Sequence, residues 1–166
     1  SGGVIEATVN GNGSKIINCD GDATFSGGKL TGFANGTVSS DETSAGGIKC
    51  AGNITISDSK VAIDCKGKGA KAINCDNYVT VNSGEVTMIA AAEDYTEIED
   101  DKKSRAIQAD CFTINDGVVV AKAYDYAISS GIAINVNGGI VNAISLNCIA
   151  FEIGVTQTDG WVLTKE

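Results

Sequence analysis

Cationic side chains precede equivalent apolar segments of this chain, and carboxylates follow the same segments. Lys15, Lys71 and Arg105 each stand two residues before an isoleucine. The carboxylates that come soon after are Asp20, Asp76 and Asp110. If the segments lie side by side, these charges form a basic line and an acidic line. A groove between them could bind the hydroxyl or carboxylate groups of a polymer, although charges spaced only for solubility would give the same pattern.

Two tyrosines lie next to the basic line, in the segment "AYDYA". An exposed tyrosine can stack on a sugar ring while its hydroxyl group makes hydrogen bonds. Tyr126 occupies the position that Lys71 and Arg105 occupy in their own segments. The candidate carbohydrate-binding residues are therefore Lys15, Lys71, Arg105, Tyr124, Asp125 and Tyr126.

The most acidic segment is "EDYTEIEDDKK", and its carboxylates are hard oxygen ligands of the kind that calcium prefers. The spacing does not match an EF-hand loop, because the central glycine and the closing glutamate are missing. A solvated loop is the alternative. The candidate calcium ligands are Asp94, Glu97, Glu99, Asp100 and Asp101, with Glu93 just before them. Calcium is the only cofactor that the sequence suggests.

The residue types favour binding over catalysis. The chain has no histidine, which excludes Ser–His–Asp and Cys–His nucleophile systems. It also lacks a Walker A or GxGxxG motif. A polysaccharide lyase reaction, with a basic side chain beside calcium-binding carboxylates, stays open as the less favoured reading. Arg105, the only arginine, follows such carboxylates in "DDKKSR".

The elements that position these residues repeat five times along the chain. The repeats align on Ile17, Ile48, Ile73, Ile107 and Ile128. Each contains three short apolar segments of period two, separated by turns rich in Gly, Asn, Asp and Ser, as expected for β-strands. The fourth repeat is one residue shorter at its first turn. The extra length between repeats lies in three polar segments, 34–46, 66–70 and 91–104.

A three-strand repeat of about 21 residues predicts one coil of a single-stranded parallel β-helix. We expect five to six coils in a single domain, residues 1–166. Residues 1–12 form an N-terminal cap or partial coil, 13–147 the five repeats, and 148–166 a C-terminal partial coil or cap. Trp161 is expected to cover the last coil.

Three cysteines, Cys19, Cys50 and Cys75, share one position of the repeat. In-register neighbours hold their Cβ atoms about 4.8 Å apart, which is wider than disulfide geometry favours. A buried column of free thiols is therefore expected. Pairing among Cys65, Cys111 and Cys148 is left open.

The net charge of −9 argues against nucleic acid and anionic membranes as partners. No apolar run is long enough to span a membrane. The chain starts at Ser1 rather than at methionine, which indicates a processed or trimmed product.

The segments "GAKAINCDNYVTVNSGEVTM" and "SRAIQADCFTINDGVVVAKAYDYAI" resemble bacterial surface proteins with a carbohydrate-binding β-helix domain. The resemblance covers roughly residues 10–147 of the chain. The segments are similar to a clostridial cell-wall-targeting family. The resemblance implies a right-handed β-helix like that of pectate lyases, an extracellular or cell-surface location, and calcium-associated binding of plant cell-wall polysaccharides without turnover. A structural or adhesive surface element is the alternative function.

Overall fold

The structure is a computed structural model that describes residues 2–97 and 101–165. These residues form sixteen strands and no helix, so the prediction of an all-β chain is confirmed. Every ladder between named strands is parallel. Within the described part of the chain, no helix is available to cross a membrane.

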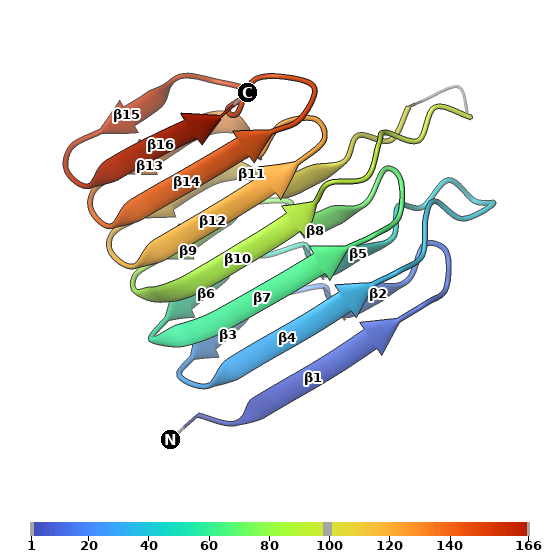
Figure 1. Cartoon of the computed structure of the whole chain (residues 1–166). Helices are drawn as coiled ribbons and strands as arrows, with labels where there is room; N and C mark the ends of the chain where they lie inside the picture. Colours follow the sequence, from blue (N-terminus) through green and yellow to red (C-terminus); the bar gives the residue numbers. More distant parts are fainter. Residues whose placement is uncertain (1, 98–100, 166) are drawn as a thin grey trace.

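One sheet contains seven strands in the order β1-β4-β7-β10-β12-β14-β16. Their bounds are Val4–Val9, Lys29–Ala34, Ser59–Cys65, Gly84–Ala90, Val118–Ala123, Ile140–Ser145 and Trp161–Lys165. Neighbours in this sheet are never consecutive in the chain. The chain therefore leaves the sheet after each strand and returns to pair in parallel with the strand that it left, as Figure 1 shows.

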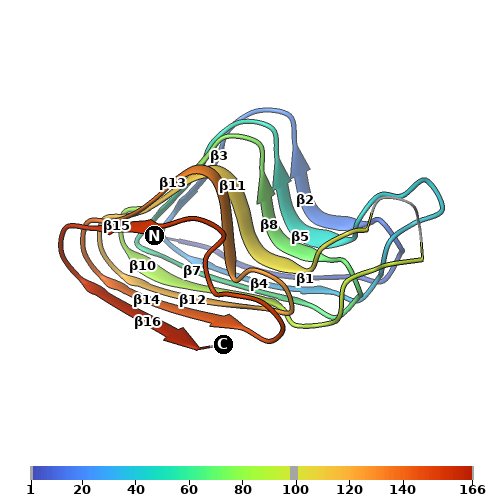
Figure 2. The same ribbon diagram turned by 90° about the horizontal axis from the view of Figure 1, so that it is seen from above.

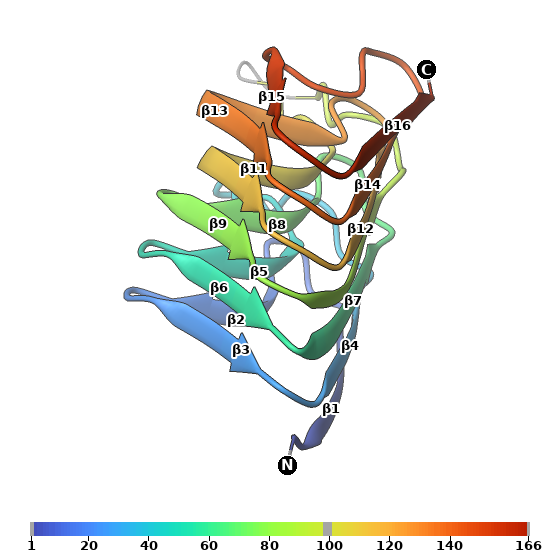
Figure 3. The ribbon, with the colours of Figure 1, turned by 90° about the vertical axis from the view of Figure 1, so that its left-hand side faces the viewer.

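The second sheet contains nine strands. One row begins with β2 (Lys15–Cys19), β5 (Gly46–Cys50) and β8 (Lys71–Cys75), and another with β3 (Ala23–Ser26), β6 (Ile54–Ser57) and β9 (Tyr78–Val81). Both rows meet on β11 (Arg105–Ile114), which pairs with β8 and with β9. The last strands are β13 (Ile128–Val136) and β15 (Val155–Gln157). Figure 3 shows the rows beside the seven-stranded sheet, seen from its edge.

The expectation of three short strands in every repeat is met only in the first three. In the fourth and fifth repeats the first two strands are continuous, as β11 and β13. The register shifts between Ala109 and Cys111, where the sequence predicts a turn one residue shorter. The shorter fourth repeat thus has one residue fewer than the fifth at this point, and both repeats bend within a single strand.

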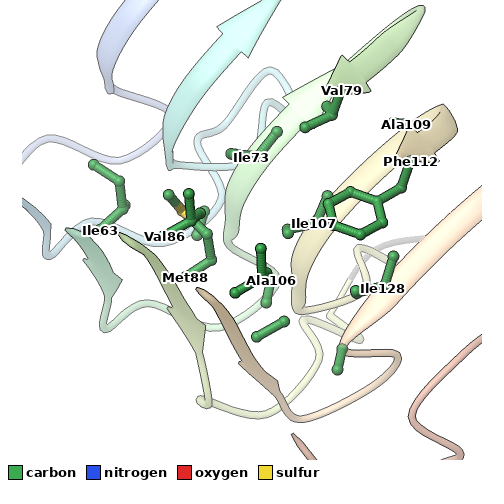
Figure 4. Packing of buried hydrophobic residues seen from close by; sticks show 14 of the residues in the cluster. Ile63, Ile73, Val79, Val86, Met88, Ala106, Ile107, Ala109, Phe112 and Ile128 are labelled. Atoms are coloured by element: carbon green, nitrogen blue, oxygen red, sulfur yellow. The ribbon is translucent and has the colours of Figure 1, made fainter. Parts of the chain in front are cut away.

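The repeat register itself is confirmed. Ile17, Ile48, Ile73, Ile107 and Ile128 are successive partners. The isoleucines of repeats two to five are at most 1% exposed. Side chains from the two sheets meet in one aliphatic core between them, shown in Figure 4. Phe112 is the largest of its fully buried side chains. Isoleucine, valine and alanine fill most of the rest, which explains how so few aromatic residues suffice.

The turns into the seven-stranded sheet depend on glycine. Gly84 and Gly117 have φ values of 102° and 96°, which side chains with a Cβ rarely adopt. A Cβ on Gly117 would also lie 2.5 Å from the carbonyl oxygen of Gly84, and one on Gly84 would lie 2.3 Å from that of Ser59. The backbone of each turn thus rests directly on the turn of the preceding repeat.

Amide side chains link the same turns from repeat to repeat. Asn115 donates to Asn82 at 2.9 Å, and Asn137 donates to Asn115 at 2.9 Å. The row starts at Ser57, which accepts from Asn82 at 3.2 Å. These bonds satisfy one polar group in each repeat with its equivalent in the next, and so favour the in-register stacking.

The three predicted insertions connect the seven-stranded sheet to the first strand of the following repeat. Segment 35–45 and the described parts of 91–104 project on the same side of the molecule, as Figure 2 shows. They flank the row of β2, β5, β8 and β11. All six cysteines are free, which confirms the column of thiols without disulfide bonds.

Trp161 does not cover the last coil, contrary to the expectation. Its side chain is 71% exposed, because it pairs in register with Ile140 on the outer side of the sheet. Val162 is the inward residue, beside the buried Val141. The aromatic residue lies one position away from the inward column, so the alternation of the strand turns it toward solvent.

Candidate functional site

The first strands of the repeats carry two columns of mainly polar residues. One column is Lys15, Gly46, Lys71 and Arg105, which are successive register partners. The other, three residues further along each strand, is Asn18, Lys49, Asn74, Gln108 and Ser129. The anchoring isoleucines between the two columns point inward. We call these two columns the polar face.

A groove of about 630 Å³ lies over the first three repeats of the polar face. Its floor comes from β2, β5 and β8, and one wall comes from the insertion at 42–44. The lining residues are Gly13, Lys15, Asn18, Glu42, Thr43, Ser44, Lys49, Lys71, Asn74 and Lys102. With four lysines and one carboxylate, it is a cationic groove in an acidic protein.

Lys71 is in the least favourable position for a charged amine. Burial, and then the neighbouring charges of Arg105 and Lys102, lower the pKa of Lys71 to about 8. No ion pair joins Lys71 to any carboxylate of the described residues. Its ammonium group is therefore partly desolvated among other cations, an arrangement that a bound anion would relieve.

Two other lysines of the groove, Lys15 and Lys49, make polar contacts with neighbouring residues. The Lys15 Nζ donates to the carbonyl oxygen of Gly13 at 2.9 Å and to that of Ser44. Burial, and then the charge of Lys49, lowers the pKa of Lys15. Lys49 forms an ion pair with Asp76, which directly follows the neighbouring strand β8. Lys15 is thus fixed by backbone oxygens and forms no ion pair with a carboxylate of the described residues.

Arg105 is enclosed by partners from the fifth repeat, from the segment just before it, and from the C-terminal segment. Its Nε lies 3.4 Å from Asp125 Oδ2, and its Nη1 donates to Ser129 Oγ at 2.9 Å. The same Nη1 lies 3.9 Å from Glu152 Oε2. The Tyr126 ring lies under the guanidinium group, with its centroid 5.6 Å from Cζ. These contacts neutralise Arg105 and leave little of its charge for a ligand.

A second hollow, of about 340 Å³, continues the polar face over β11 and β13. We call it the acidic hollow, because three carboxylates and one arginine line it. The lining residues are Cys75, Asp76, Arg105, Gln108, Ala109, Asp110, Ser129, Gly131 and Glu152. The Gln108 Oε1 is buried there and has no hydrogen-bond partner among the described residues.

The candidate carbohydrate-binding residues separate into two groups. Lys15 and Lys71 line the cationic groove, and Arg105 adjoins it. Asp125 is 8% exposed and holds Arg105, and Tyr126 packs on the same guanidinium. Tyr124 is half-buried and lines neither hollow. The tyrosines and Asp125 therefore do not join the lysines in the groove.

Sequence reasoning missed the second column of the polar face and Lys102 of the insertion. The signal for the column was present, because Asn18, Lys49 and Asn74 each follow an anchoring isoleucine directly. With the isoleucine inward, alternation places the next residue outward. The signal was overlooked because the lysine occurs there in only one repeat.

Of the proposed calcium ligands, the structure describes Asp94, Glu97 and Asp101. Each of them contacts another side chain. Asp94 lies 3.0 Å from the Lys103 Nζ and accepts from the Ser104 amide at 2.9 Å, and Asp101 lies 3.8 Å from the same Nζ. Glu97 accepts from the Tyr95 hydroxyl at 3.4 Å. Glu99 and Asp100 lie outside the described residues. Within the described ranges, no three acidic, His or Cys side chains form a metal-binding group.

Comparison of the chain with protein-family models, with curated proteins and with solved structures finds no match. The chemistry of the polar face is therefore the guide to function. A fold does not by itself imply a function. The feature that needs an explanation is the gathering of four lysines in one groove of a chain with a net charge of −9.

Proposed function

We propose that the protein is a non-catalytic carbohydrate-binding module that binds an extended acidic polysaccharide in the cationic groove. The observation that carries this proposal is the set of four lysines lining one groove, with Lys71 desolvated and without a carboxylate partner among the described residues. The scaffold that we propose is a right-handed, single-stranded parallel β-helix. Its support is the return of the chain, after each passage through the second sheet, to a parallel in-register neighbour.

Electrostatics favours an anionic ligand. The four lysines share one space, and burial adds a cost for the charged amines of Lys15 and Lys71. A carboxylate that enters the groove offsets this cost with charge-assisted hydrogen bonds. The amides of Asn18 and Asn74, on the floor of the groove, add donors and acceptors suited to hydroxyl groups. This combination fits a uronate sugar, which carries both kinds of group.

The shape of the groove favours an extended chain over a compact ligand. Its floor crosses three successive strands, β2, β5 and β8, which lie about 4.8 Å apart. Equivalent side chains therefore recur at intervals near the length of one sugar unit. A polysaccharide that runs across the strands would meet a similar environment in each repeat. We place such a polymer at the cell surface or outside the cell.

An adhesive or structural surface element is the second candidate function. One specific feature favours it, an apolar strip on the outer side of the seven-stranded sheet. The exposed members of this strip are Val118, Ile140, Trp161 and Leu163. Such a surface could contact another macromolecule without any role for the groove.

Calorimetry with polygalacturonate, at low ionic strength and with either calcium or a chelator, tests the proposal. We expect binding by the natural protein, and at least tenfold weaker binding after Lys49→Gln and Lys71→Gln together. Lys60→Gln, on the other sheet, is the matched control and should bind as the natural protein does. Neutral cello-oligosaccharides should bind far more weakly. Absence of binding to polygalacturonate with and without calcium would overturn the proposal and favour the adhesive role.

A further inference from the structure

The polar face changes the sign of its charge along its length. Over the first three repeats the groove carries Lys15, Lys49, Lys71 and Lys102 against the single carboxylate of Glu42. The acidic hollow, over β11 and β13, carries three carboxylates against one arginine: Asp76 directly after β8, Asp110 on β11 and Glu152 of the C-terminal segment. The change falls between β8 and β11, which are hydrogen-bonded neighbours.

The two hollows are adjacent. Lys71 of the groove is the register partner of Arg105 of the acidic hollow, and Asn74 is the partner of Gln108. The ion pair between Lys49 and Asp76 also joins the two linings. A polymer that crosses β2, β5 and β8 would therefore reach the carboxylates as its next contacts.

Arg105 does not extend the run of cations into the fourth repeat. Asp125 and Glu152 lie on two sides of its guanidinium group, so its charge is already matched. Asp110 is exposed and forms no ion pair with any described residue. An anionic group of a ligand at this level would face unpaired negative charge, and like charges at close range oppose binding.

We infer that the acidic hollow limits the length of the bound ligand, so that the site accommodates a run of about three anionic sugar units, one for each of the first three repeats. This inference rests on the proposed function and specifies its ligand. The site therefore binds the end of a polysaccharide chain or a short acidic segment of it. A longer uniform polyanion gains nothing from the units that extend beyond the third repeat.

Oligogalacturonates of defined length test this limit by calorimetry at low ionic strength. Each favourable exposed ion pair changes affinity by about two- to fivefold. Trigalacturonate should therefore bind more tightly than digalacturonate. Hexagalacturonate should bind within about fourfold of the trimer, the gain that its alternative registers supply. A hexamer that binds tenfold or more tightly than the trimer would overturn the length limit while leaving the proposed function intact.

Asp110→Lys tests whether the carboxylates set the limit. It replaces an unpaired negative charge in the acidic hollow by a positive charge, and should tighten hexamer binding severalfold with little change for the trimer. Asp116→Lys is the control, because Asp116 is an exposed residue in the turn before β12 and changes the net charge equally. Equal effects of the two substitutions on the hexamer-to-trimer ratio would contradict the inference. If no oligomer binds the natural protein, the proposed function itself fails and the limit falls with it.

Discussion

Lys71 and Arg105 are register partners on adjacent strands, yet only Arg105 forms ion pairs with carboxylates of the described residues. Arg105 lies between Asp125 and Glu152. Lys71 has no ion pair with a described carboxylate, and its pKa falls to about 8 through burial and the nearby cations. One cation is thus part of the fold, and the other faces an open groove. This difference separates the structural role of Arg105 from the binding role proposed for Lys71.

Binding of an acidic oligosaccharide should depend on pH near 8. Lys71 is protonated below its pKa of about 8 and loses its charge above it. A bound carboxylate favours the charged form, so affinity should fall as the pH rises from 7 to 9 and beyond. Calorimetry with trigalacturonate across this range checks the prediction. Lys71→Gln should bind more weakly at pH 7 and lose most of the pH dependence; an unchanged profile in this variant would contradict the assignment.

The stability of the unliganded protein should change with pH in the opposite direction. The pKa of Lys71 is lowered in the folded state from 10.5 to about 8, so below pH 8 the cost of its charge is fully present. Between about pH 8 and 10.5 the unfolded chain binds more protons, and the free energy of unfolding rises with pH. Urea unfolding at pH 7.5 and 9 should show a smaller rise in Lys71→Gln than in the natural protein. Equal rises in the two proteins would refute the prediction.

Arg105→Ala should reduce stability much more than binding. The substitution removes the partner of Asp125, which is only 8% exposed, and an unpaired buried carboxylate costs about 1–3 kcal/mol. Urea unfolding measures this loss, with Lys60→Ala as the control for removal of an exposed ion pair. Because Arg105 is already neutralised, affinity for trigalacturonate should change by less than about threefold. A large loss of affinity in folded Arg105→Ala would place this residue in the binding site.

Gly117→Ala should destabilise the fold by roughly 1–3 kcal/mol or more. Its φ of 96° disfavours a side chain, and the new Cβ would lie 2.5 Å from the carbonyl oxygen of Gly84. Gly21→Ala is the matched control, because no atom lies within 4 Å of a Cβ at that position. The two variants are compared by thermal and urea unfolding. Equal stability would mean that the turns do not depend on close backbone stacking.

Much of the fold could be predicted because its pattern repeats. The apolar period of two and the spacing of the turns place Ile48 beside Ile73 and Thr55 beside Thr80, and both pairs are register partners. The one-residue shift near Ala109 was also visible as a shortened turn. The weak apolar pattern of a single strand becomes predictive when it recurs, because equivalent residues of successive repeats have to pair in register.

The site could be predicted only in part, because one-dimensional spacing does not say which charges neutralise each other. Lys15 and Lys71 were found as a column, but Arg105 in the same column is matched by Glu152 from a distant segment. Trp161 was misplaced because a shift of one position reverses the direction of a strand side chain. Lys102 was missed because the path of an insertion does not follow the repeat.

Lysine footprinting by mass spectrometry is the most direct test of the cationic groove. The protein is acetylated sparingly with and without polygalacturonate, and the rate at each lysine is compared. We predict that the ligand protects Lys15, Lys49, Lys71 and Lys102, which line the groove. Lys29, Lys60 and Lys122, in the seven-stranded sheet, should react at unchanged rates. Equal protection of both sets, or protection of the second set alone, would contradict binding in the groove.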